Sequence, residues 1–127
     1  SDVKSAYIAY LKSKTAITSL LTDSSEIRET EWQGTEFVYP NIRVAADFLP
    51  AVNRCLDTAE IVVEVYSEQK SSDQASTIAG AIQTIYHGHP FEQGSMKFPV
   101  VIVTKVDAPV RDIFAWVSKV SIKTQIA

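Results

Sequence analysis

Residues 59–88 constrain the fold most strongly, because two different hydrophobic periods follow one another there. Residues 59–66 are rich in β-branched side chains, and alternate positions give one wholly aliphatic strand face. Residues 75–86 instead repeat apolar side chains at helical spacing, and Gly88 stands where a glycine commonly ends a helix. Ser71 with Gln74 matches a capping box at the helix start. The pattern predicts a strand followed by a helix that packs back onto a sheet.

The rest of the chain adds elements around this unit. Residues 47–57 have no clear period and are expected to form a long loop. The other expected elements are one bent or two short helices within 2–21, a charged edge strand over 26–32, and strands over 41–46, 98–107 and 113–123. This order predicts an α+β fold, in which a mostly antiparallel sheet carries helices packed on one face.

Size and composition fit one α+β domain covering residues 1–127. The chain has 46% hydrophobic and 21% charged residues, which are ordinary values for a globular domain. No apolar run has the length of a bilayer span, and no secretory signal is visible. A single cysteine, Cys55, excludes an internal disulfide framework and favours a reducing compartment.

Charge argues against one class of partner and marks one segment. The net charge of −3 argues against nucleic-acid binding over a broad surface. Residues 23–36 contain five acidic side chains, with Arg28 as their only basic neighbour. Such a segment is usually a solvated edge, and the functional alternative is a surface that faces a basic partner or repels phosphate.

No residue pattern in the sequence indicates catalysis. His87 and His89 have a spacing found in metal sites, but Gly88 and Pro90 interrupt any strand there. Cys55 lies in the expected loop, without a neighbouring base. The chain contains no glycine-rich phosphate loop and no nucleophile elbow. We therefore expect no enzyme activity, no cofactor and no metal.

The candidate functional residues are those suited to protein contacts. A tryptophan near a turn anchors many interfaces, apolar side chains in a loop need a packing partner, and a charged pair at a hairpin tip can reach a neighbouring subunit. Trp32 has the alternative role of a lid over the sheet edge. The candidate interface residues are Glu26, Glu29, Glu31, Trp32, Phe48, Leu49, Arg54, Arg111 and Asp112.

The order of elements resembles one family of structural proteins. The N-terminal helical segment ends at Leu20-Leu21, and Tyr39-Pro40-Asn41-Ile42 introduces the second strand. A strand over 59–67 precedes a helix that ends Ile85-Tyr86-His87-Gly88, and a hairpin with its last strand over 114–122 closes the chain. In these features the sequence resembles the tail-terminator (tail-completion) proteins of long-tailed bacteriophages.

The resemblance implies a homohexameric ring in the tail or neck of a virion, made in the host cytoplasm. Such a ring caps the tail tube, contacts the tail tube protein and the head-side connector or stopper protein, and lets DNA through as cargo. An acidic lumen lined by Glu26, Glu29 and Glu31 would let DNA pass without binding. That hypothesis fails if these side chains line the outer wall.

Three other functions stay open from the sequence. The first is a head-completion or stopper protein of the neck. The second is a small ligand-binding regulatory domain that uses the loop over 47–57 as a lid. The third is a small hydrolase that depends on Cys55 or on the two histidines.

Overall fold

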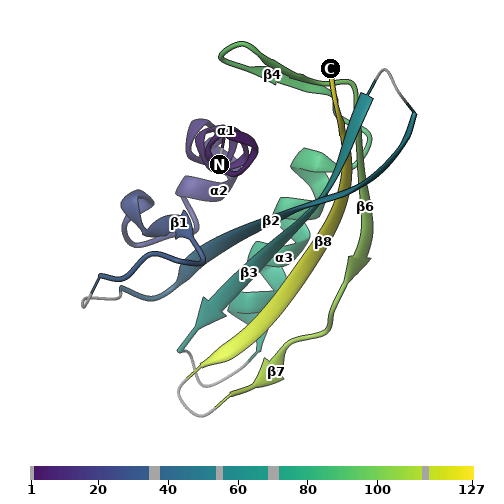
Figure 1. Cartoon of the computed structure of the whole chain (residues 1–127). Helices are drawn as coiled ribbons and strands as arrows, with labels where there is room; N and C mark the ends of the chain where they lie inside the picture. Colours follow the sequence, from purple (N-terminus) through teal and green to yellow (C-terminus); the bar gives the residue numbers. More distant parts are fainter. Residues whose placement is uncertain (1, 35–37, 54–55, 69–71, 113–114) are drawn as a thin grey trace.

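A computed structural model describes residues 2–34, 38–53, 56–68, 72–112 and 115–127. A six-stranded sheet has helices on one side and a separate two-stranded hairpin near the chain's C-terminus (Figure 1). The elements, in chain order, are α1 (Asp2–Ser13), α2 (Thr15–Thr18), the short 3₁₀ helix η1 (Ser24–Glu26), β1 (Ile27–Glu29), β2 (Asn41–Asn53), β3 (Leu56–Ser67), α3 (Asp73–Tyr86), β4 (Phe91–Gln93), β5 (Met96–Phe98), β6 (Val100–Val106), β7 (Val110–Arg111) and β8 (Trp116–Ile126).

The sheet order confirms the expected fold class. The strands follow the order β1-β2-β3-β8-β6, and β7 also pairs with β8. β1 runs parallel to β2, whereas every other described pairing in the sheet is antiparallel. The fold is therefore α+β, with a mostly antiparallel sheet and one parallel edge strand.

The strand and helix expected from residues 59–88 form the centre of the core. Ile61, Val63 and Val65 of β3 are fully buried, and α3 lies behind β3 and β8 in Figure 1. The buried face of α3 carries Ala75, Ile78, Ala79, Ile82 and Tyr86, and Ile85 is half-buried. Gly88 adopts a φ of 71°, a left-handed conformation that favours glycine after a helix.

Five aromatic rings fix α1 on the same side of the sheet as α3. Tyr7 of α1 stacks on Tyr86 of α3 at 5.0 Å between ring centroids, and Tyr10 stacks on Phe91 at 4.2 Å. The Tyr86 hydroxyl donates a hydrogen bond to the Tyr7 carbonyl oxygen at 2.8 Å. Phe98 adds an edge-on contact with Tyr7, so the first helix is tied to residues far along the chain.

The prediction that residues 47–57 form a loop is wrong. β2 continues to Asn53 and β3 begins at Leu56, so the segment is a long hairpin. Cross-strand pairing continues to Leu49, and the register then shifts before Asn53. Pro50 lies beyond the part of β2 that pairs with β1, so β2 is an edge strand there, and proline is tolerated in edge strands.

Three smaller expectations also need correction. The charged strand is only Ile27–Glu29, because Glu26 belongs to η1 and a turn at residues 30–31 precedes Trp32. The helix begins at Asp73 with Ser72 as its N-cap, Ser71 lies outside the described residues, and the Gln74 side chain accepts a hydrogen bond from the Ser67 hydroxyl. The connector after Gly88 contains the β4–β5 hairpin.

Candidate functional site

One face of the sheet carries no helix in the part of the chain that the structure describes (Figure 1). Alternation along each strand produces this face: positions between the buried residues of β3 and β8 point away from α3. We call this surface the open face, and define it by eight residues of the two central strands: Glu60, Val62, Glu64 and Tyr66 of β3, and Val117, Lys119, Ser121 and Lys123 of β8.

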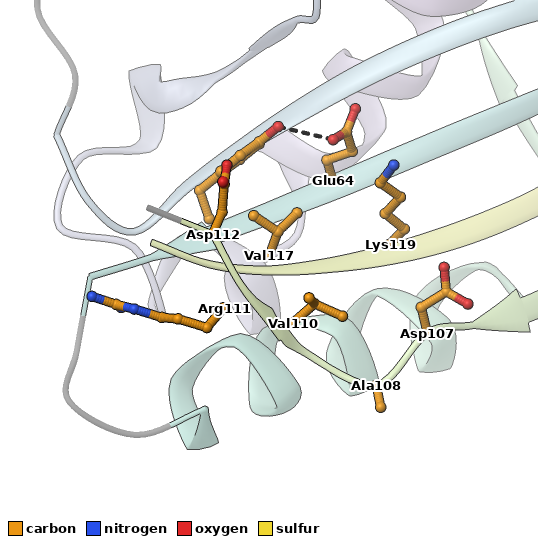
Figure 2. A pocket seen from close by; sticks show the side chains of 9 residues that line it. Glu64, Asp107, Ala108, Val110, Arg111, Asp112, Val117 and Lys119 are labelled. Carbon is orange, nitrogen blue, oxygen red and sulfur yellow. Dashed lines mark hydrogen bonds between the residues drawn. The ribbon is translucent and has the colours of Figure 1, made fainter. Parts of the chain in front are cut away.

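The open face carries opposite charges on neighbouring strands. Glu60 is the cross-strand partner of Lys123, and Glu64 is the partner of Lys119. None of these four side chains takes part in an ion pair with a described residue. Figure 2 shows Glu64 and Lys119 rising from β3 and β8 on the same side of the sheet. The face therefore presents an acidic row beside a basic row.

A hollow of about 450 Å³ lies on the open face beside β7 (Figure 2). Val110 and Val117 form an apolar part of its wall, and Val110 is 66% exposed. Its polar lining includes Asp112 and Arg111, and the Arg111 side chain extends away from Lys119. The structure thus brings two of the candidate interface residues to the end of the open face.

Tyr66 links this hollow to a second one. Its hydroxyl donates a hydrogen bond to Glu64 Oε2 at 2.8 Å. Partial burial, followed by the hydrogen bond to Glu64, raises the pKa of Tyr66 to about 12. Tyr66 therefore stays a neutral hydrogen-bond donor at physiological pH and lines both hollows.

The second hollow, of about 300 Å³, lies against Trp32. The Arg28 guanidinium stacks over the Trp32 ring at 3.6 Å from its centroid, and the Arg43 guanidinium lies 5.4 Å from it. A Cβ atom at Gly34 would come within 1.8 Å of the indole, so only glycine fits beside the ring in this position. Trp32 is half-buried and lies against Arg28 of the edge strand β1 and Arg43 of β2.

The expectation that Glu26 is a surface acid is wrong. Its side chain is only 4% exposed and lies 3.5 Å from Arg43 Nη2 and 3.3 Å from Arg28 Nη2. Arg43 Nη1 also donates to the Glu26 carbonyl oxygen at 3.2 Å. The cause is tertiary, because β1 lies parallel to β2 and brings Arg43 to the start of the acidic segment. Glu26 stabilises the fold instead of facing a partner.

Two further acids of that segment pair with the first helix. Lys4 Nζ lies 2.6 Å from Glu31 Oε2 and 3.7 Å from Glu29 Oε2. The hydrogen bond from Lys4 holds the pKa of Glu31 below its ordinary value, and the same bond raises the pKa of Lys4. Asp23 accepts hydrogen bonds from the backbone N–H and hydroxyl of Ser25. The acids are thus largely engaged within the chain.

The remaining predicted residues are not among the eight that define the open face, and some lie outside the described residues. Phe48 and Leu49 belong to β2, while Arg54 and Cys55 lie outside the described residues. His87 Nδ1 accepts a hydrogen bond from the Val103 N–H at 3.1 Å. The described residues include no group of three or more histidine, cysteine or acidic side chains that could hold a metal ion. Among these residues, every helix is too short or too polar for a membrane span.

The charged rows of the open face were not predicted from the sequence. Their signal is nonetheless local: Glu60 and Glu64 stand four residues apart in one expected strand, and Lys119 and Lys123 stand four apart in another. Such spacing puts each pair on one strand face. The information that was lacking is the β3–β8 register, which brings the two rows side by side.

Comparison with known proteins supports the architecture. No family model matches the sequence, and no curated protein matches it as a relative. A solved chain in the structure "Virion of native gene transfer agent (GTA) particle" has a similar fold, with a TM-score of 0.80. The similarity covers 98% of this chain and 93% of that chain, at 10% sequence identity. The two chains therefore share one α+β fold over nearly their whole lengths.

Proposed function

We propose that this protein is a structural subunit of a phage-like virion, and specifically a tail terminator. In this role it forms a ring, expected to be a hexamer, that caps the tail tube and joins it to the head-side connector. DNA passes through the ring as cargo, and the chain performs no catalysis.

One observation carries the proposal. The fold similarity to a chain of a gene transfer agent virion covers almost all of both chains. The sequence independently resembles the tail-terminator family in the order of its strands and helices. The sequence resemblance therefore agrees with the fold similarity, and both support a structural role in a phage-like virion.

The surfaces available to neighbouring subunits differ from those expected. Glu29 and Glu31 remain exposed candidates, but their pairing with Lys4 reduces the field that they project. Arg111 and Asp112 extend from the end of the sheet beside Val110, where an adjacent subunit can reach them. A lumen lined by Glu26 is not proposed, because that side chain is buried.

The position of the chain in the particle tests this role. Particles assembled without the protein should carry tails of abnormal length, and supplying the wild-type chain should restore uniform tails. Electron microscopy of complete particles should show a ring of this chain at the head-proximal end of the tube. Density for the chain elsewhere in the virion, or tails of normal length in its absence, would reject the terminator role.

The same experiment distinguishes the neighbouring role of a stopper protein. Loss of a stopper should leave tails of normal length that are detached from heads, because the tube itself ends normally. The ligand-binding alternative depended on a lid over 47–57, and that segment pairs as the β2–β3 hairpin. No observation on the described residues favours it over the virion role.

A further inference from the structure

We propose that the open face binds a second copy of this chain, face to face, to give a symmetric dimer. The inference is independent of the tail-terminator role, because it concerns the purified chain and a surface of its own sheet. The occupant follows from the way the face is charged. A surface with one acidic and one basic row is complementary to itself.

The strand register fixes the geometry of this pairing. Glu60 lies beside Lys123, and Glu64 lies beside Lys119, at matching heights along β3 and β8. Consider a two-fold axis that runs parallel to β3 and β8, midway between them and above the open face. It places β3 of one copy over β8 of the other and keeps every residue at the same position along the strand direction. It sets Glu60 over the partner's Lys123 and Glu64 over the partner's Lys119. Each dimer then contains four pairs of opposite charge.

The space between the rows is suited to close approach. Val62 and Ser121 lie side by side between the charged positions, and both are only half-exposed. The same axis sets Val62 over the partner's Ser121, so two small side chains meet at the centre. Packed sheets lie about 10 Å apart, which such small residues permit.

The state of the charges in the single chain supports an intermolecular role. Lys119 and Lys123 form no ion pair with a described residue, whereas nearby Lys105 already pairs with Asp107 at 3.1 Å. Charges aligned across an interface set its register and partner choice more than its affinity. The apolar wall of Val110 and Val117 extends the contact surface beyond the charged rows.

A charge exchange tests the dimer. The variant Lys119→Glu/Lys123→Glu has an acidic face, and Glu60→Lys/Glu64→Lys has a basic face. Sedimentation of the wild-type chain should show a monomer–dimer equilibrium that weakens with salt, because exposed charges are screened. Each variant alone should dimerise about tenfold more weakly or worse, since like charges then face each other. The two variants mixed should associate more tightly than wild type.

A matched control separates the face from net charge. Lys12→Glu/Lys97→Glu changes the net charge as much as the acidic-face variant does, at exposed sites on α1 and β5. This control should dimerise like wild type, and circular dichroism should show every variant folded. A wild-type chain that stays monomeric at all concentrations, or a variant mixture that does not associate, would overturn the proposal. So would a wild-type assembly that the acidic-face variant forms equally well.

Discussion

The acidic segment over residues 23–34 and the open face contain similar residue types but use them in opposite ways. In the acidic segment, Glu26 and Glu31 each meet a cation supplied by another element, Arg43 of β2 and Lys4 of α1. On the open face, Glu60 and Lys119 have no ion pair among the described residues. The first region uses its charges to hold the chain together, and the charges of the second form no ion pair with a described residue.

This difference shows that charge density along the sequence is a poor guide to a docking surface. The acidic segment is conspicuous in the sequence because four acids lie close together in it. The charges of the open face are spread over two strands more than fifty residues apart in the chain. What distinguishes the regions is whether each charge already has a partner, and the following predictions test that distinction.

The largest effect is expected at the buried ion pair. Glu26→Gln removes the carboxylate that pairs with both Arg28 and Arg43, so both guanidinium groups lose this anionic partner. The free energy of unfolding should fall by about 3 kcal/mol, measured by urea denaturation. The double variant Glu26→Gln/Arg43→Met should recover part of this loss. A Glu26→Gln protein as stable as wild type would contradict the claim that the acidic segment uses its charges to stabilise the fold.

A smaller effect is expected at Gly34. Gly34→Ala places a methyl group against the Trp32 ring, so the ring must leave its stack on Arg28. We expect a loss of about 1–2 kcal/mol, since overpacking and a lost cation–π contact both contribute. Urea denaturation gives the stability, and tryptophan fluorescence in a Trp116→Phe background reports the environment of Trp32. Unchanged fluorescence would show that the stack does not depend on the glycine.

On the open face, Tyr66 provides a test at high pH. Its pKa is raised to about 12 from 10.0, so its folded form favours the neutral phenol. This contribution to stability is complete below pH 10.0 and is lost as the pH rises to about 12. The difference in stability between wild type and Tyr66→Phe should change across that window, and tyrosinate absorbance should identify the late titration. Ionisation of Tyr66 near pH 10.0 would contradict its bond to Glu64.

The smallest effect is expected at Glu31. Lys4 lowers the pKa of Glu31 below 4.5, so this pair stabilises the fold above that pH and stops doing so as the pH falls through the lowered value. Glu31→Gln should remove a slight acid dependence and leave neutral stability almost unchanged, because the pair is exposed. Urea denaturation at several acidic pH values measures this. A loss as large as that in Glu26→Gln would mean that exposed and buried acids of the segment act alike.

The successful predictions from sequence depend on local periodicity. The buried faces of β3 and α3 follow from spacings of two and of three or four residues, which the backbone geometry imposes directly. Gly88 follows from the same local logic, because its left-handed φ ends the helix. The long hairpin over 47–57 was missed because Pro50 and Asn53 are typical of loops, and only pairing with β3 keeps this segment extended.

For residues 59–88 the sequence alone determined where the strand and the helix form and which of their faces is apolar, since those properties depend on neighbours a few residues apart. The tertiary structure decided which charges are paired. Glu26 is buried because the β1–β2 pairing places it beside Arg43, which lies seventeen positions later in the sequence. Likewise, the two charged rows became one surface only through the β3–β8 register. Electrostatic energy depends on distance in space, and strand order sets that distance.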